Sequence, residues 1–572
     1  MGRGTGTTRE AVPARTRAGT GARLRPDPVR DRLYANLNRL GLDAWDCGGG
    51  PRDDELGQPV NDRDFAVSGM SLGDLRAVLE AEAKACGGKV TPLEIVTDRG
   101  RQHSGYRISA PWTDPEGIEI MLAREEISTG LRHQDFEITP IPAELIDELM
   151  AQGMTRDQAH REVMRRDAVR RDRTVNQIMR NVRTGETLDF FGGVQDLRDR
   201  VLRPISPDTC RDDPMRTLRG ITRMSKDGLV ALPEAEQQIR ENAHRLAHLT
   251  QDKIFKELDK TLKGRHVRPA LLFACETGAL QHALPEFAPS VGYDQMNPYH
   301  PLLLHEHEIL AVQRAVDLDA PMPVRWAALM HDIGKAHMGW SLPGENRRRF
   351  NRKAGAGMFD PARFGHEEWS VELAREGFER MECGNEFMSE TLPLIEHHMF
   401  TDDRDFEQRN ELRQRLVARQ FIARVAADRL RDRQAATRLV ENLLTLRYCD
   451  HAAKDPDAPT RRAETPFERV VRDELANCPL HKSHLTLKGG ELIKAGLKPG
   501  PVLTEIEQEL LHRIQASDDP VTASRRSGAD LAEVIAARGD VERFRSYPFI
   551  ERWAADAVIK AQRRLQHADT ER

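Results

Sequence analysis

Two aspartates that precede a short apolar run constrain the fold of this chain more than any other feature. Asp62 and Asp64 are one residue apart and lead into Phe65-Ala66-Val67, a run that predicts an extended strand. Because side chains on a strand alternate between its two faces, both carboxylates should project from the same face. Paired carboxylates suit magnesium, which prefers oxygen ligands and usually keeps phosphate oxygens among them.

A glycine turn lies upstream of the two aspartates. Gly48, Gly49 and Gly50 would allow the backbone to approach a phosphate group closely. In so charged a chain, an Asp-x-Asp pair alone is usually a pair of solvated loop residues. Together with a glycine turn at this distance, the pair outlines a site for nucleotidyl transfer.

Residues 48–64, GGGPRDDELGQPVNDRD, resemble the glycine-turn, Arg-Asp and Asp-x-Asp signature of tRNA nucleotidyltransferases and bacterial poly(A) polymerases. These enzymes belong to the wider superfamily of DNA polymerase beta. The resemblance implies that Gly48, Gly49 and Arg52 contact the nucleotide. It also implies that Asp62 and Asp64 are catalytic and bind Mg²⁺.

Length and composition indicate a soluble, helix-rich protein of three or four domains. The 572 residues exceed what one core supports, and 39% are hydrophobic while 31% are charged. We find no apolar run near the roughly 18–20 residues that span a bilayer. Seven scattered Cys without a Cys-x-x-Cys pair fit a reducing cytosol. We therefore expect a cytoplasmic protein with no membrane and no evident obligate protein partner.

The charge distribution restricts how a nucleic acid could bind. The net charge is -5, so an RNA partner would have to meet a local basic surface. The first 25 residues hold six Arg and one acid but lack an apolar signal core, which argues against secretion. We interpret this segment as a disordered basic arm, with a transit peptide as the alternative.

Alternating patterns after the aspartates predict a small mixed sheet with flanking helices. A helix is expected at 71–85, followed by strands at 89–97, 103–110 and 117–123. Glu119 could face the two aspartates as a third carboxylate beside the metal, or it could be an ordinary strand residue facing solvent.

Residues 125–165 are polar and helix-prone, and the stretch is longer than the family usually has at this place. In the family, this region includes a flexible loop that takes part in switching between CTP and ATP. An unusual segment here leaves the choice of nucleotide open.

A second motif follows this segment. VRRDRTVNQI, residues 169–178, resembles the family's Arg-Arg-Asp-aromatic-Thr-x-Asn motif, which contacts the ribose and phosphates. The resemblance implies nucleotide contacts by Arg171, Asp172 and Asn176. A solvated basic helix face is the alternative interpretation of these residues taken alone.

A third motif, RDDPMRTLRGITR, spans residues 211–223. Asp213 and Pro214 suit the cap and first turn of a helix, which places Arg216 and Arg219 on one face. A carboxylate accepts hydrogen bonds and a guanidinium donates them, so Asp213 and Arg216 could together read the edge of a base. A capped amphipathic helix with a surface ion pair is the alternative.

This motif resembles the family's Glu-Asp-x-x-Arg motif, which serves as a protein template for the incoming CTP or ATP. Asp212, Asp213 and Arg216 occupy its positions, with Asp rather than Glu first. We include Arg219 among the nucleotide-binding residues. Residues 230–290 are amphipathic and fit the helical neck that follows the catalytic domain in this family.

The chain departs from the family's pattern at three places. Gly50-Pro51 stands where small and aliphatic residues are more common, Arg173 replaces an aromatic residue, and Gln177 replaces an alanine. These changes spare the polar residues of each motif.

A second constellation of histidines and acids begins at His300. It contains the His331-Asp332 doublet ahead of Gly-Lys, with histidines on both sides, including His397 or His398, and a late aspartate. Imidazole and carboxylate ligands suit Mn²⁺, Ni²⁺ or similar cations, which can activate a bound water. The pattern resembles an HD-type phosphohydrolase domain, and the alternative is a helical body with idle histidines. The implied metal ligands are His307, His331, Asp332, His366, His397 and Asp428.

Towards the C-terminus the patterns are weaker. Residues 451–480 suggest a connector, and residues 488–501, KGGELIKAGLKPGP, resemble a short element that recurs in bacterial tRNA nucleotidyltransferases with HD domains. The predicted fold class is α+β, with a mixed β-sheet catalytic domain of the DNA polymerase beta superfamily and largely helical remaining parts. The predicted domains are a tail at 1–30, a nucleotidyltransferase domain at 31–175, a recognition and neck domain at 176–290, an HD domain at 291–450 and an RNA-binding tail at 451–572.

We therefore expect an RNA 3′-end nucleotidyltransferase that adds CCA to tRNA from CTP and ATP and releases pyrophosphate. A second, metal-dependent phosphohydrolase activity would belong to the HD domain. A poly(A) polymerase or an enzyme that adds only CC or only A would share the same motifs. From another class, a phosphohydrolase could use a degenerate transferase domain to hold RNA.

Overall fold

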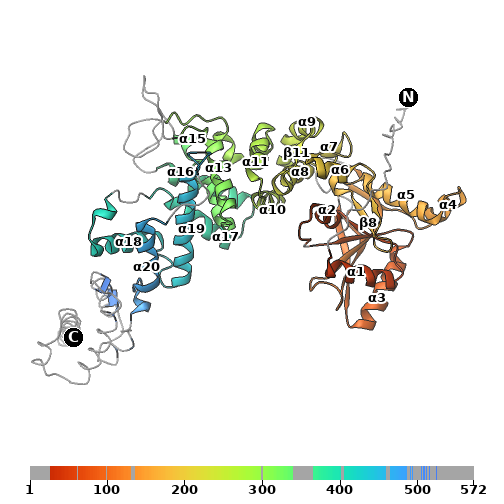
Figure 1. The fold of residues 1–572 in the computed structure, drawn as a ribbon, viewed down its shortest axis with the longest axis horizontal. Helices are drawn as coiled ribbons and strands as arrows, with labels where there is room; N and C mark the ends of the chain where they lie inside the picture. The colour runs from red at the N-terminus through yellow and green to blue at the C-terminus, as the bar shows by residue number, and fades with distance from the viewer. Residues whose placement is uncertain are drawn as a thin grey trace, which may run out of the picture. The chain divides into compact units, whose positions relative to one another are not determined.

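A computed structural model describes residues 26–60, 62–97, 100–129, 136–297, 300–338, 365–400, 405–458 and 464–485, with single positions between 490 and 524. The chain forms two compact units (Figure 1). The first unit comprises Met1–Val291 with Gly377–Cys383, and the second comprises Gly292–Glu376 with Gly384–Arg572. The finer domain boundaries expected from the sequence stay predictions, and the 488–501 element lies largely outside the described residues.

A seven-stranded mixed sheet forms the centre of the first unit, as predicted. The strand order is β3-β4-β5-β2-β1-β8-β9, in which β2 and β5 run parallel and the other neighbours run antiparallel. The strands are β1 Ala44–Cys47, β2 Asp64–Val67, β3 Lys89–Thr97, β4 Gly100–Ser109, β5 Ile118–Leu122, β8 Met179–Asn181 and β9 Thr187–Leu188.

Helices cover both faces of this sheet because its buried side chains alternate. Phe65 and Val67 of β2 pack with helices α1 Pro28–Arg39 and α3 Leu72–Cys86 in one apolar cluster. Ala66, which points the other way, packs with helices α4 Leu145–Ala151 and α5 Arg156–Val169 in a second cluster. The strand that begins at Asp64 is thereby fixed on both sides.

The predicted elements of this unit are largely present, with one exception. The helix expected at 71–85 is α3, and the three strands expected after it are β3, β4 and β5. The first part of the 125–165 segment is not helical, so that prediction was wrong there. Strands β6 Arg124–Ser128 and β7 Phe136–Pro140 form an antiparallel hairpin, and the helices α4 and α5 follow it.

The rest of the first unit is mainly helical, and helix α8 packs against α7, α9, α10 and α11. Two short strands, β10 Val201–Leu202 and β11 Val230–Ala231, pair in parallel. The other elements are α2 Gly49–Leu56, η1 Thr174–Asn176, α6 Gly193–Asp199, α7 Thr209–Asp212, α8 Met215–Asp227, α9 Pro233–Asn242, η2 Ala243–His248, α10 Gln251–Leu262, α11 Val267–Glu276, α12 Ala279–Ala283 and η3 Pro285–Ser290.

The described part of the second unit is helical. Helix α14 packs against α13, α17 and α19, and α18 packs against α20. Its elements are α13 Leu304–Asp317, α14 Met322–Met330, α15 Lys335–Met338, α16 His366–Arg380, α17 Asn385–His397, η4 Phe406–Gln408, α18 Glu411–Val425, α19 Arg433–Ala452, α20 Pro466–Asn477 and η5 Lys482–His484, and the end of α16 from Gly377 belongs to the first unit. Among the described residues of the chain, no helix combines the length and apolarity needed to span a bilayer.

Replacement by alanine should change the stability of the first unit in opposite directions at two of its glycines. At Gly105 in β4, an added Cβ would lie 2.3 Å from the carbonyl oxygen of Ile120, whereas at the exposed Gly73 in α3 it would meet only Ser71 Oγ at 3.7 Å. We expect Gly105→Ala to lower the free energy of unfolding by about 1–3 kcal/mol because backbone must move. Gly73→Ala should raise it by up to about 1 kcal/mol through helix propensity.

Urea unfolding of the full chain, followed by circular dichroism, measures both effects. Equal midpoints for the two variants would contradict this account of the sheet.

Candidate functional site

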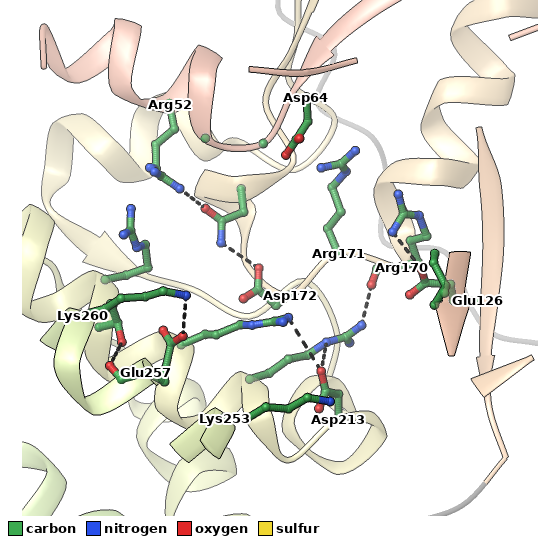
Figure 2. A pocket seen from close by; sticks show the side chains of 18 of the residues that line it. Arg52, Asp64, Glu126, Arg170, Arg171, Asp172, Asp213, Lys253, Glu257 and Lys260 are labelled. Carbon is green, nitrogen blue, oxygen red and sulfur yellow. Dashed lines mark hydrogen bonds and ion pairs between the residues drawn. The ribbon is translucent and has the colours of Figure 1, made fainter. Parts of the chain in front are cut away.

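A cavity of about 910 Å³ in the first unit collects the predicted nucleotide-binding residues (Figure 2). Asp62, the other predicted catalytic aspartate, is exposed immediately before β2 and does not belong to the lining. The predicted residues that line the cavity are Gly48, Gly49, Arg52, Asp64, Arg171, Asp172, Asn176, Asp213, Arg216 and Arg219.

Asp64 is in a strongly negative environment. Burial raises its pKa to about 6, together with the negative charges of Asp62 and Glu119, while the charge of Arg171 acts in the opposite direction. Figure 2 shows the Arg171 side chain reaching towards Asp64. A carboxylate held among other carboxylates favours a cation, which would restore its charged form.

Glu119 lies beside Asp64 because β2 and β5 pair these two residues in register. Its side chain forms an ion pair with Arg107. Within the described residues, every group of three or more potential ligands within 4.8 Å of one another belongs to the second unit. Glu119 therefore does not join Asp62 and Asp64 in such a group.

The glycine turn leads directly into helix α2. Gly48 has a φ of 74°, a conformation that favours glycine, and α2 begins at Gly49. An added Cβ at Gly48 would lie 3.4 Å from Arg171 Nη1, so the backbone approaches that guanidinium closely. The N-terminus of α2 thus presents backbone N–H groups to the cavity, an arrangement suited to phosphate.

Hydrogen bonds connect the first and second sequence motifs. Arg52 Nη1 donates to Asn176 Oδ1 at 2.7 Å, and Asn176 Nδ2 donates to Asp172 Oδ1 at 2.8 Å (Figure 2). Burial alone would raise the pKa of Asp172. The charges of Arg173 and Arg219 and the bond from Asn176 lower it below its ordinary value, so Asp172 stays an acceptor.

Asp167 organises the Arg170-Arg171 pair and was missed by sequence reasoning. Its carboxylate accepts bonds from Arg170 Nε and Arg171 Nη2, each at 2.9 Å. Burial raises the pKa of Asp167, but the two guanidinium charges outweigh burial and hold it well below its usual range. The spacing of three and four residues between an acid and two arginines on a helix could have revealed it.

The third motif brings an acceptor and two donors together at one side of the cavity. Asp213 Oδ1 accepts from the N–H of Met215 at 2.9 Å, and its Oδ2 lies 3.9 Å from Arg216 Nε and 3.8 Å from Arg219 Nη1. Arg216 Nη2 also donates to the carbonyl oxygen of Arg170 at 2.6 Å. The base-reading pair expected from the sequence is therefore adjacent, and it is attached to the second motif.

Several cavity residues had no signal in the sequence motifs. The hairpin contributes Glu126, whose carboxylate accepts from Arg170 Nη1 at 2.9 Å. Helices α8 and α10 contribute Lys226, Lys253 and Lys260 to the lining. Burial lowers the pKa values of Lys226 and Lys253. Basic residues outnumber acidic ones in the lining, which favours a polyanion such as a nucleoside triphosphate. The charged lining residues outside the sequence motifs are Glu94, Arg124, Glu126, Lys226, Lys253, Glu257 and Lys260.

A second candidate site lies among the helices of the second unit, where two groups of buried ligands share one carboxylate. Asp332 belongs to both groups. Its Oδ2 lies 3.5 Å from His307 Nε2 and 3.3 Å from His331 Nε2, and its Oδ1 lies 3.3 Å from His366 Nε2. The two groups are His307, His331, Asp332 and Asp450, and Asp332, His366 and His398.

The hydrogen bonds of three histidines make this cluster suitable for cations. Nδ1 of His307, His331 and His398 faces the carbonyl oxygens of Ala453, Ala328 and Ile395 at 3.3, 2.9 and 2.7 Å. A carbonyl oxygen can only accept, so in a neutral imidazole Nδ1 carries the proton and Nε2 is a lone pair. Lone pairs that face carboxylate oxygens repel them unless a cation lies between, so the residues present fit one or two metal ions.

Two predicted ligands of this site lie outside the cluster. His397 is replaced by its neighbour His398, because successive helical residues point about 100° apart and only His398 turns towards Asp332. Asp428 follows α18, has a side chain that is 75% exposed and lies 3.7 Å from Arg429. Asp450 in the last turn of α19 takes its place, 3.1 Å from His307 Nε2. The candidate ligand groups that the structure brings together therefore contain His398 and Asp450, and not His397 or Asp428.

Models of three protein families match parts of the chain. The poly A polymerase head domain matches residues 115–203, the probable RNA and SrmB-binding site of polymerase A matches 232–290, and the HD domain matches 304–433. The first match contains the second sequence motif, and the third contains His331-Asp332.

Relatives with the name multifunctional CCA protein match about half of the chain or slightly more. The one from Azoarcus sp. strain BH72 is 29% identical over 343 residues, which cover 59% of this chain and 68% of that protein. The one from Neisseria gonorrhoeae strain NCCP11945 is 31% identical over 300 residues, which cover 52% and 63%. Except for the Azoarcus protein, the first of these relatives are matched over less than two thirds of their length.

A solved structure, that of the Bacillus stearothermophilus CCA-adding enzyme in complex with CTP, has the same fold. It matches with a TM-score of 0.50 at 20% identity, covering 86% of this chain and 93% of that one. The family models and the relatives confirm the predicted resemblance to tRNA nucleotidyltransferases that carry an HD domain.

Measurements of metal binding distinguish the ligands predicted from the sequence from those that the structure brings together. Asp450→Asn should weaken Ni²⁺ binding at least about tenfold, because it removes a charged ligand from the cluster. Asp428→Asn should leave the affinity unchanged, since its carboxylate is exposed. Calorimetric titration of the full chain with Ni²⁺ measures both, and the same comparison applies to His398→Ala and His397→Ala. Weaker binding in the Asp428 variant alone would restore the original ligand set.

Proposed function

We propose that the first unit adds CCA to the 3′ end of tRNA from CTP and ATP. The observation that carries this proposal is the single cavity that joins Asp64, the glycine turn, the Arg52–Asn176–Asp172 chain and the Asp213–Arg216 pair. The relatives named multifunctional CCA protein support CCA addition, although this chain spans only about two thirds of their length.

Different residues of the cavity would bind the metal, the phosphates and the ribose during nucleotidyl transfer. Mg²⁺ bound at Asp62 and Asp64 would supply charge neutralisation between the RNA 3′-oxygen and the α-phosphate. The 3′-oxygen bonds to the α-phosphorus as it loses its proton, and the bond to pyrophosphate breaks. Gly48, Gly49 and Arg171 hold the phosphates, because N–H groups and a guanidinium meet there, while the Arg52–Asn176–Asp172 chain offers the ribose an acceptor.

The Asp213–Arg216 pair offers a chemical reason for the choice of CTP and ATP. Cytosine and adenine each present an amino donor beside a ring-nitrogen acceptor on the pairing edge, whereas uracil and guanine present a carbonyl and an N–H there. The Asp213 carboxylate accepts from an amino group and the Arg216 guanidinium donates to a ring nitrogen. A fixed acceptor and a fixed donor therefore favour C and A together and disfavour U and G.

The histidine and carboxylate cluster supports a second activity, the hydrolysis of phosphate esters. Its ligands, His307, His331, Asp332 and Asp450 with His366 and His398 around the shared Asp332, would hold Mn²⁺ or Ni²⁺. The metal would lower the pKa of a bound water and so supply the nucleophile. Lys335 Nζ, 2.6 Å from Asp332 Oδ2, adds a positive charge suited to a substrate phosphate.

Labelled-nucleotide incorporation tests the transferase. With Mg²⁺ and tRNA that lacks its 3′ end, the chain should incorporate C from CTP alone and A after both CTP and ATP are supplied. Asp64→Ala should lower incorporation at least about a thousandfold because it removes a metal ligand. Asp114→Asn is the matched control, since that side chain is 46% exposed and makes only a 4.0 Å ion pair with Arg32.

The pattern of incorporation distinguishes the alternatives. Addition of A alone in long tracts indicates a poly(A) polymerase, and addition of only CC or only A indicates a partial enzyme. No incorporation by the unaltered chain, beside a working control enzyme, would contradict the transferase proposal.

Hydrolysis of a 2′,3′-cyclic nucleotide with Mn²⁺ or Ni²⁺ tests the second activity. We expect His331→Ala to abolish release of the monophosphate, because His331 is fully buried within the ligand cluster. Asp64→Ala should retain full hydrolysis, since Asp64 belongs to the other unit. Equal hydrolysis by the His331 variant and the unaltered chain would exclude this cluster as the site.

A further inference from the structure

Arg173 carries a buried charge beside the nucleotide cavity, and it has no role in the proposed transfer reaction. Arg173 is 0% exposed and stands where an aromatic residue is usual in the family that the chain resembles. Its Nη2 donates to the backbone carbonyl oxygen of Arg216 at 3.0 Å and lies 3.4 Å from Cys210 Sγ. Arg173 thus contacts the helical turn that carries the base-reading arginine.

A glycine in helix α8 makes room for this side chain. A Cβ added at Gly220 would lie 2.9 Å from Arg173 Nη2 and 3.5 Å from its Nε. Gly220 is one helical turn beyond Arg216, on the same side of α8. The guanidinium therefore lies against the α8 backbone where the absence of a side chain permits it.

The same guanidinium acts on Asp172. Burial raises the pKa of Asp172, and the largest opposing contribution is the charge of Arg173, followed by those of Arg219 and Arg216 and the bond from Asn176. Nε and Nη1 of Arg173 have no hydrogen-bond partner within the described structure. A buried guanidinium with so few bonds is costly, so stability alone does not account for its position.

We propose that Arg173 is a positioning residue that couples the Asp172–Asn176 pair to the turn of α8 that carries Arg216. This inference rests on the proposed function of the cavity. An aromatic side chain at residue 173 could neither donate to the Arg216 carbonyl from a charged group nor neutralise Asp172. Arg173 does both. One guanidinium therefore binds the backbone on the base side of the cavity and neutralises the carboxylate on the ribose side.

Nucleotide binding measured without RNA tests this coupling. Arg173→Met keeps an unbranched, flexible side chain, although a shorter one, and removes its charge. It should weaken the binding of CTP and ATP about ten- to a hundredfold, and it should reduce discrimination against UTP and GTP. Gly220→Ala, which displaces the guanidinium without removing it, should reduce discrimination in the same way. Gly73→Ala, at an exposed position of α3 in the same unit, is the matched control and should bind as the unaltered chain does.

The pH profile of binding separates a positioning role from a merely structural one. The charged groups that act on Asp172 are Arg173, Arg216 and Arg219. Without Arg173 the pKa of Asp172 rises, so its carboxylate becomes protonated at a higher pH as the solution is acidified. The acid limb of CTP binding should therefore move to higher pH in Arg173→Met. It should return towards its original position in Arg173→Lys, which restores the charge.

Equilibrium dialysis with Mg²⁺ and each nucleotide provides all of these measurements. If Arg173→Met keeps its circular dichroism spectrum and binds all four nucleotides as the unaltered chain does, the proposal is overturned. If that variant does not fold, Gly220→Ala decides, and unchanged discrimination in Gly220→Ala overturns it. An unaltered chain that binds CTP and ATP but does not extend tRNA would refute the proposed function and leave this test intact.

Discussion

The nucleotide cavity depends on one buried carboxylate, that of Asp167. It accepts bonds from Arg170 and Arg171 and from the backbone N–H of Arg124, so α5, the β6–β7 hairpin and the second motif meet at one negative charge. The two guanidinium groups hold its pKa low despite burial, so the carboxylate stays charged inside the protein. Without it, Arg171 would lose its ion pair and Arg170 would depend on Glu126, a costly arrangement in a buried site. Because the carbonyl of Arg170 also accepts from Arg216, the same charge helps to fix the Arg216 side chain.

The two candidate sites differ in how their carboxylates are paired. In the first unit, carboxylates such as Asp167 and Asp213 have arginine partners on the same chain, and the cavity retains an excess of basic groups for an anionic ligand. In the second unit, the lone pairs of His307 and His331 face the oxygens of Asp332. Acceptors that face acceptors need a proton or a cation between them, so this cluster suits metal ions. The first site therefore suits a substrate that brings phosphate and magnesium, and the second suits a resident metal.

Sequence patterns could predict the residues whose spacing carries chemistry, and the structure places most of these together. The Asp64 strand, the Asp172–Asn176 motif and the Asp213–Arg216 pair were accessible because each has a fixed local spacing. Asp450 was not accessible, since it is far from His331 in sequence and only the packing of α19 on α13 and α14 brings it near. The choice between His397 and His398 depends on helical phase, which adjacent histidines do not reveal. The hairpin at 124–140 was missed because its polar residues resemble those of an exposed helix.

The positions that depart from the family's pattern do not have the structure expected of a transferase site that has lost its activity. Gln177 is fully buried, donates to the carboxylate of Asp189 and accepts from the N–H of Phe190 at 3.2 Å. Gly50 leaves room for Asp46, whose Oδ1 would lie 2.7 Å from an added Cβ. A transferase domain kept only to hold RNA would have no reason to retain polar residues buried and bonded beside its nucleotide cavity, because each bond must offset the cost of desolvation. Their integration therefore favours an active transferase over the degenerate alternative.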